Sequence, residues 1–258
     1  EDVSAQINFQ QLVEKGIQAI QNNEFQKVVL SRRETVSVAN FDLVATFQKL
    51  VQQYRSAFVY CFHHPKIGTW LGASPEQLLK ANAVSFETMA LAGTQKDTGA
   101  AEVIWQQKEQ EEQQFVTDYI VSKLKAVSAE IQVSEAYSVK AGSLWHIKTD
   151  ISGEFGQELD LKKAIQFLHP TPAVCGVPKA ISKAFIVANE NYNRSFYTGF
   201  LGELNRNFAS DLFVNLRCMQ IENNEAHLYM GCGITKDSIP EKEWKESVNK
   251  SMTMKRIL

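Results

Sequence analysis

Apolar residues recur at helical spacing in several stretches of the chain. Between residues 9 and 21 they share one face of a helix, which the Asn22-Asn23 pair is expected to end. Residues 41–54 repeat this pattern. Further helices are predicted over about 101–131, 160–168 and 178–189, and from Pro240 towards the last residue.

Other stretches predict strands. "KVVLSRRETV" follows the first helix, "YSVKAG" and "SLWHIKTDISGEF" lie mid-chain, and hairpins are predicted around Pro65 to Gly68, around Asn82 as two short strands, and at Asn223-Asn224 within "LFVNLRCMQIENNEAHLYMGCGI". Long helices thus alternate with antiparallel hairpins. This order favours an α+β fold over a doubly wound parallel sheet.

Prolines are concentrated in one passage, "HPTPAVCGVPKA". The chain has six prolines, and Pro170, Pro172 and Pro178 fall within it. Each proline fixes its own φ and pushes the preceding residue towards extended geometry. We therefore predict a stiff loop here rather than a helix.

"GASPEQLL" resembles a helix start. Ser74 is a plausible N-cap and Pro75 suits the first helical position, which would place Glu76 in the first turn. A helix start lowers the pKa of a carboxyl group, so a role for Glu76 as a proton donor would require burial or a nearby anion.

Composition and charge narrow the class of protein. The 258 residues carry 27 Lys and Arg against 29 Asp and Glu, without a clustered basic surface, which argues against nucleic acid as a partner. No apolar run is long enough to span a bilayer, and the first residues lack the pattern of a signal peptide. Four cysteines without C-x-x-C spacing suggest reduced thiols. We expect a cytoplasmic protein with one continuous domain over residues 1–258.

Glu112 lies where the predicted helix should face the core. At about 100° per residue, Phe115, Val116 and Tyr119 fall within about 60° of it. An ionised carboxylate in an apolar stripe is costly unless a cation or several donors meet it. The alternative is a solvated glutamate at a frayed helix end.

Two acids and one lysine share a face of the last helix. Glu243, Glu246 and Lys250 fall within about 60° of one another, apart from the stripe of Trp244, Val248 and Met252. Paired carboxylates suit a hard cation such as Mg²⁺, with the lysine left to meet an anion. A solvated helix with an ordinary Glu–Lys pair has the same pattern.

Lys27 precedes a continuous apolar run at the start of a predicted strand. It is either a gatekeeper at a sheet edge or a buried amine with a lowered pKa. To act as a base near neutrality, Lys27 would need a pKa about three units below the usual value of roughly 10.4. That shift corresponds to about 4 kcal/mol of free energy.

The "MGCGI" segment is a weak dinucleotide signal, because no helix start with the remaining glycine follows it. Gly231 and Gly233 are better explained as backbone that an anion can approach closely. With a two-residue turn at Asn223-Asn224, Arg217 would pair near Met230, beside these glycines. Arg217 then either binds a carboxylate or forms a structural salt bridge.

Ten segments in consistent order resemble the chorismate-utilising enzymes, the family of isochorismate, salicylate, anthranilate and aminodeoxychorismate synthases. The segments are "KVVLSR", "GASPEQLL", "ALAGT", "EQQFV", "LWHI", "HPTPAVCG", "FYTGFLGEL", "VNLRCM", "GCGI" and "EWKES". The resemblance covers residue 9 onwards. It implies antiparallel β-sheets packed together and flanked by helices, a Mg²⁺ cofactor and chorismate as the substrate.

The resemblance also implies roles for matching residues. Lys27 would be the general base that activates water for attack at C2, and Glu76 the acid that protonates the departing C4 hydroxyl. Glu112 and Glu246 would hold Mg²⁺, with Glu243 acting on the ion less directly. The remaining residues expected to contact the substrate are Gly93, Thr94, His146, Ala173, Tyr197, Arg217, Gly231, Gly233 and Lys250. His146 could equally be an ordinary half-buried residue.

Two departures from the family pattern stand out. The family usually has Glu-His where this chain has Glu112-Gln113, which should be tolerated because the carboxylate remains. The segment that precedes the first helix in longer members is absent or short, so the domain is expected to lack an N-terminal part.

The nucleophile separates the members of the family. Ala92 stands where aminodeoxychorismate synthases of the common type carry an attacking lysine, which disfavours covalent amination. Anthranilate synthases use ammonia and usually lack the water-activating lysine, which is present here as Lys27. Isochorismate synthase is the first hypothesis, acting as a monomer without an amidotransferase subunit. The alternatives are salicylate synthase, which adds pyruvate elimination, and a non-catalytic chorismate-binding homologue.

Overall fold

The computed structural model describes residues 2–99, 102–128, 130–155 and 161–258. Its helices are α1 (Val3–Gln21), α2 (Leu43–Gln53), α3 (Gln107–Leu124), α4 (Leu161–Leu168), α5 (Lys179–Asn189) and α6 (Pro240–Lys255). Its strands are β1 (Lys27–Ser37), β2 (Phe58–His64), β3 (Gly68–Ser74), β4 (Gln77–Ala81), β5 (Ser85–Lys96), β6 (Ile131–Val133), β7 (Tyr137–Ala141), β8 (Leu144–Glu154), β9 (Gly176–Val177), β10 (Phe200–Arg206), β11 (Ala209–Val214), β12 (Cys218–Glu222) and β13 (Glu225–Ile234).

The strands form two sheets. One has the order β2-β3-β12-β13-β1-β9, and the other has the order β10-β11-β4-β5-β8-β6, with β7 also pairing with β8. Every strand pairing within the described ranges is antiparallel. The α+β prediction is therefore confirmed.

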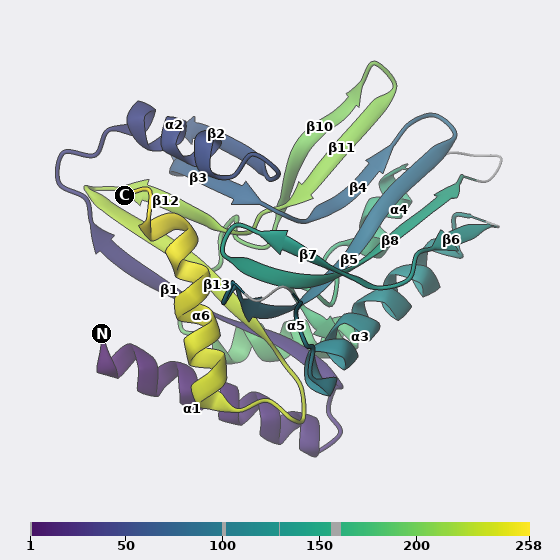
Figure 1. The fold of residues 1–258 in the computed structure, drawn as a ribbon, viewed down its shortest axis with the longest axis horizontal. Helices are drawn as coiled ribbons and strands as arrows, with labels where there is room; N and C mark the ends of the chain where they lie inside the picture. Colours follow the sequence, from purple (N-terminus) through teal and green to yellow (C-terminus); the bar gives the residue numbers. More distant parts are fainter. Residues whose placement is uncertain (1, 100–101, 129, 156–160) are drawn as a thin grey trace.

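Helices cover both sheets (Figure 1). Apolar residues of α1, α5 and α6 pack on β1 and β13, and α1 and α6 lie side by side. Apolar residues of α3 and α4 pack on β4, β5 and β11 of the other sheet. Each sheet thus has its own hydrophobic core. Within the described ranges, no helix combines the length and apolar character needed to cross a membrane.

Local chemistry explains several boundaries. Asp2 caps α1 by accepting hydrogen bonds from the backbone N–H groups of Ser4 and Ala5. Asn223 and Asn224 both have positive φ, as a two-residue hairpin turn requires. The register of this hairpin pairs Cys218 with Tyr229, as the sequence predicted.

Three expectations were wrong. Pro75 and Glu76 do not start a helix, because β4 begins immediately afterwards and pairs with β11. The segment from residue 212 is not one hairpin: β11 and β12 belong to different sheets, and the chain leaves one sheet for the other near Arg217, whose φ is 48°. The strand after Asn82 is not short, since β5 has twelve residues.

The long helix predicted over about 101–131 is also shorter than expected. It is α3, which starts where Gln106 and Glu109 form a reciprocal capping box and ends at Leu124. Residues 101 and 129 of this range, and residue 160 of the helix predicted over 160–168, lie outside the described residues. The "HPTPAVCGVPKA" passage forms a loop between α4 and α5, as predicted, and also contains the two-residue strand β9, which was not predicted.

Candidate active site

One cavity collects most of the residues singled out in the sequence. It encloses about 620 Å³ of empty space that is partly continuous with solvent. The predicted residues in its lining are Glu76, Gly93, Thr94, Glu112, His146, Ala173, Tyr197, Arg217, Gly231, Gly233 and Lys250. They come from both sheets, from α3 and α6, and from the proline-rich loop, so the cavity lies where these parts meet.

Lys27 is fully buried just behind this cavity. Its Nζ lies 3.2 Å from Glu112 Oε1, and it has no directed hydrogen bond among the described residues. Strand β1 lies between β9 and β13, so Lys27 is not a gatekeeper on an exposed edge. Burial lowers the pKa of Lys27, and the charge of Glu112 offsets part of that effect.

Glu112 lies inside the protein rather than at a frayed helix end. Only 8% of its surface is exposed, and its carboxylate is in contact with Lys27. A Cβ on Gly233 would lie 1.9 Å from Glu112 Oε1 and 3.1 Å from Lys27 Cε. Gly233 is therefore needed for the close approach of these two side chains to β13.

Glu76 lies on a different wall of the cavity, between β3 and β4, and is almost fully buried. Burial raises the pKa of Glu76 to about 8, although Lys27, Lys250 and Arg217 act against this. The expected pKa-lowering effect of a helix start is absent, because there is no helix here. Glu76 is therefore protonated at neutral pH and can donate a proton.

Neutral His146 and cationic Arg217 form a hydrogen-bonded pair. His146 Nδ1 lies 2.9 Å from the carbonyl oxygen of Gly93, and Nε2 lies 3.2 Å from Arg217 Nη2. Nδ1 thus donates to Gly93 while Nε2 accepts from Arg217. Burial, together with Arg217 and Lys250, lowers the pKa of His146 to about 3. Among the described residues Arg217 has no carboxylate within 4.0 Å, which does not support the salt-bridge alternative.

Tyr197 and Lys250 lie against strand β13 at Gly231. A Cβ on Gly231 would be 2.9 Å from Tyr197 Oη, and Lys250 Nζ donates to the Gly231 carbonyl oxygen at 2.8 Å. The Tyr197 ring also stacks on Tyr229, with centroids 5.6 Å apart. Gly231 therefore allows the Tyr197 hydroxyl to approach the backbone of β13, and its carbonyl oxygen accepts the hydrogen bond from Lys250.

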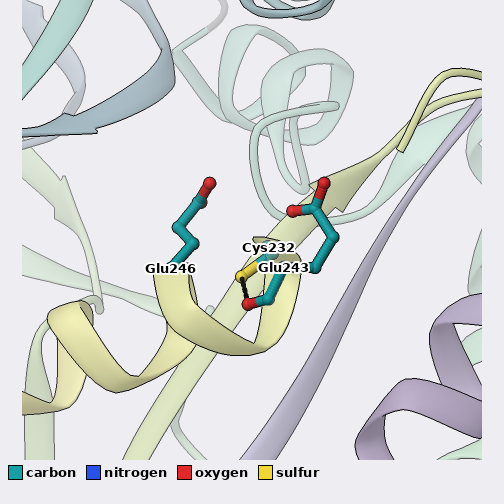
Figure 2. Close-up of side chains that lie close together, drawn as sticks. All are labelled: Cys232, Glu243 and Glu246. Carbon is teal, nitrogen blue, oxygen red and sulfur yellow. Dashed lines mark hydrogen bonds between the residues drawn. The ribbon is translucent and has the colours of Figure 1, made fainter. Parts of the chain in front are cut away.

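The predicted acids of α6 project to the same side of the helix (Figure 2). One oxygen each of Glu243 and Glu246 and the Cys232 thiol lie within 4.8 Å of one another. Burial raises the pKa of Glu243 to about 7. Burial also acts against ionisation of Glu246, but Lys250 and Lys108 lower its pKa below the usual value. Neither acid is the fully solvated residue of the alternative interpretation.

A second cavity adjoins the first. Its lining includes Thr94, which both cavities share, together with Glu243, Glu246 and Lys108. It encloses about 1060 Å³ of space that opens to solvent. The acids of α6 thus face solvent through this second cavity.

The carboxylates suit a hard divalent cation. Oxygen ligands are the preferred partners of such ions, and Glu243 Oε2 is buried without a hydrogen-bond partner in the part of the chain that the structure describes. Cys232 is a poor candidate ligand. Its thiol donates to the Glu243 carbonyl oxygen at 3.3 Å, and burial raises its pKa well above the usual value, which keeps it protonated (Figure 2).

Lys108 is a site residue that the sequence analysis missed. Its Nζ lies 2.6 Å from Glu243 Oε1. Although burial acts against its charge, Glu243, Glu246 and Glu112 together raise the pKa of Lys108. The one available signal was its position four residues before Glu112, on the same helical face.

A buried ion pair fixes the proline-rich loop, and this pair was also missed. Arg194 forms hydrogen bonds through Nε and Nη2 to the Glu190 carboxylate, and also donates to the carbonyl oxygens of Val29 and Val174. Strand β1 and the loop are thereby joined. Arg194 thus supplies part of the rigidity that the prolines alone were expected to give.

Gln113 replaces the family's usual histidine without touching the acid cluster. Its Nε2 donates to Thr117 and to Thr149 of β8, at 2.9 and 2.8 Å. The residue therefore links α3 to the neighbouring sheet while Glu112 keeps its position.

Comparison with known proteins agrees with this arrangement. The sequence profile described as "Chorismate binding enzyme" matches residues 1–258. This chain belongs to the chorismate binding enzyme family. It is 28% identical to isochorismate synthase EntC of Escherichia coli K12 over 267 residues, which cover 99% of this chain and 68% of EntC.

Solved structures of the family share the fold. DhbC of Bacillus anthracis, described as a 2,3-dihydroxybenzoate-specific isochorismate synthase, matches with a TM-score of 0.91 and 27% identity, over 99% of this chain and 72% of that one. MenF, the menaquinone-specific isochorismate synthase of Escherichia coli, matches with a TM-score of 0.88 and 27% identity, over 98% and 61%. The chain thus spans about two thirds of the length of these relatives.

Proposed function

We propose that this protein is an isochorismate synthase, which adds water at C2 of chorismate and releases the C4 hydroxyl. The observation that carries the proposal is the burial of one amine and one carboxyl group at the same cavity: Lys27 lies against Glu112 of its lining, and Glu76 is in the lining itself. Burial lowers the pKa of the Lys27 amine and raises that of the Glu76 carboxyl. A buried base beside Glu112 of the cavity lining and an acid in that lining suit a reaction that removes one proton and supplies another.

In the proposed reaction, Lys27 takes a proton from water as the water oxygen bonds to C2. The ring double bonds shift, and the C4–O bond breaks as Glu76 protonates the departing hydroxyl. One water molecule enters and one leaves, so the product is an isomer of the substrate. Since water is the nucleophile, no amidotransferase partner is needed.

The cationic groups of the cavity would bind the substrate's carboxylates. Arg217, Lys250 and the Tyr197 hydroxyl are close to the Gly231 backbone and suit the enolpyruvyl carboxylate. Neutral His146 holds Arg217 through Nε2. These contacts would orient C2 towards Lys27 and C4 towards Glu76.

Mg²⁺ is the proposed cofactor. Glu112 and Glu246 would hold it, with Glu243 beside them, and when bound it would offset the charge of the substrate's ring carboxylate. The proposal is supported by Glu112 at the first cavity, by Glu243 and Glu246 at the second, and by Glu243 Oε2, a buried oxygen without a hydrogen-bond partner among the described residues.

Product analysis after incubation with chorismate and Mg²⁺ tests the proposed function. Isochorismate alone is the expected result. Salicylate with pyruvate would instead make this a salicylate synthase, and the absence of any turnover would leave a binding homologue.

Glu246→Ala should weaken the dependence on metal. We expect the Mg²⁺ concentration for half-maximal activity to rise by about 10- to 100-fold, the range known for perturbed metal sites. Glu241→Ala is the matched control, because Glu241 is exposed on the same helix. An unchanged Mg²⁺ titration for Glu246→Ala would remove Glu246 from the metal site.

Gly233→Ala should strongly reduce kcat while the protein stays folded, with only a modest change in melting temperature. The new Cβ would displace the Glu112 carboxylate, and a shift of about 1 Å in a catalytic site can cost about 100-fold in rate. Gly16→Ala is the matched control. Its Cβ would lie 2.9 Å from Leu30 Cδ1, outside both cavities. Comparing kcat and melting temperature for the two variants checks this, and equal kcat values would contradict it.

A further inference from the structure

The three carboxylates of the proposed metal site each lie beside one lysine side chain. Lys27 contacts Glu112 at 3.2 Å, Lys250 contacts Glu246 at 2.7 Å, and Lys108 contacts Glu243 at 2.6 Å. The Glu246–Lys250 and Glu243–Lys108 pairs are therefore balanced in charge without any bound ion. A divalent cation thus has to enter a cluster whose negative charge is already partly compensated.

Lys108 differs from the other two amines. Lys27 and Lys250 have roles towards the substrate in the proposed function, whereas Lys108 lines the second, solvent-open cavity together with Glu243 and Glu246. Its side chain is 16% exposed, and that of Glu243 is 2% exposed. Lys108 thus lies on the side of the cluster from which an ion would arrive.

We propose that Lys108 is a built-in counter-cation that competes with the divalent ion for the negative charge of Glu243, beside the proposed ligands Glu112 and Glu246. When no ion is bound, the Lys108 ammonium links α3 to α6, because it donates a hydrogen bond to Glu243, which lies 135 positions later in the sequence. The same charge limits the affinity of the empty site. Tight metal binding then requires the negative charge of the substrate, so the ion and chorismate bind cooperatively. This inference rests on the proposed metal site.

Metal titration without substrate tests the role of Lys108. The variant Lys108→Gln keeps a hydrogen-bond donor for Glu243 but removes the positive charge. In calorimetric titration with MgCl₂ alone, we expect it to bind Mg²⁺ at least about tenfold more tightly than the unaltered protein, since one like charge near the ion is lost. Lys108→Arg should restore the original affinity. Lys123→Gln, on the last turn of the same helix and away from both cavities, should change nothing.

Thermal unfolding gives a second readout that does not depend on activity. Lys108→Gln should melt at a lower temperature than the unaltered protein without metal, and Mg²⁺ should raise its melting temperature by the larger amount. Even a variant that unfolds without metal should regain its fold with Mg²⁺. Equal or weaker Mg²⁺ affinity in Lys108→Gln, or no extra stabilisation by Mg²⁺, would overturn the role of Lys108. Failure of both proteins to bind Mg²⁺, with or without chorismate, would overturn the metal site itself.

Discussion

Lys27→Ala is expected to abolish turnover while Mg²⁺-dependent binding of chorismate stays measurable. Removal of a positioned general base costs about 10²- to 10⁴-fold in rate. Lys27 is the buried amine beside Glu112 and does not line the substrate cavity itself, so its loss should affect kcat rather than ligand affinity. Steady-state kinetics and calorimetric titration of chorismate with Mg²⁺ separate the two effects.

Two further variants distinguish the loss of the base from a general loss of structure. Lys27→Met fills nearly the same volume without the amine and should be as inactive as Lys27→Ala. Lys250→Met removes an amine that lies against Gly231, and it should weaken substrate binding instead. Retained turnover in a folded Lys27 variant would refute the role of Lys27 as the base.

Glu76→Gln is expected to lose activity and to gain stability at alkaline pH. The glutamine cannot supply the proton for the departing hydroxyl, so kcat should fall by about 10²- to 10⁴-fold. The pKa of Glu76 in the folded protein is about 8, raised from a usual value of 4.5. In the unaltered protein kcat/KM should therefore fall as the pH rises through about 8.

The sign of the stability effect follows from the same shift. Because the folded pKa is raised, the folded protein keeps a proton that the unfolded chain loses above about pH 4.5. The stabilisation associated with this proton is complete at low pH and is lost as the pH rises through about 8. The free energy of unfolding should be measured for both proteins at pH 5 and at pH 9. Between these two pH values it should fall by on the order of a few kcal/mol more in the unaltered protein than in Glu76→Gln.

Glu87→Gln is the control for this titration. Its side chain is 63% exposed and, within the described ranges, forms its one ion pair with an exposed lysine, so its removal should leave both pH profiles unchanged. A Glu76→Gln variant that unfolds with the same pH dependence as the unaltered protein would show that Glu76 is not protonated in the fold. Its role as the acid would then fail.

Helical periodicity offered part of this arrangement as one of two interpretations, because a helix face is a local property. The burial of Glu112 and the shared face of Glu243, Glu246 and Lys250 both follow from 100° per residue. The hairpin register beside Arg217 also follows from the two-residue turn. Each of these features depends on residues within a few turns or one hairpin.

Tertiary pairing determined what the sequence did not show. Ser74, Pro75 and Glu76 carry the local signals of a helix start, but the Ser74 hydroxyl donates to the Val214 carbonyl oxygen at 2.5 Å and the next strand pairs with β11. This long-range pairing replaces the helix. It also buries Glu76, which reverses the direction expected for its pKa.

The contact of Lys108 with Glu243 could not be predicted for a related reason. Their helices are far apart in the sequence, and the relative placement of α3 and α6 depends on the packing of two sheets. Helix periodicity predicted which way each side chain faces on its own helix. It could not predict which of them would meet.

Isotope incorporation tests the central claim most directly, namely that this cavity activates water for attack at C2. The protein is incubated with chorismate and Mg²⁺ in ¹⁸O-labelled water, and the product is analysed by mass spectrometry. We predict that isochorismate carries the label on the C2 oxygen, since that oxygen comes from solvent while the original C4 hydroxyl departs. Isochorismate without label would show that the hydroxyl moves within the substrate, and it would contradict the assignment of Lys27 and Glu76 as base and acid.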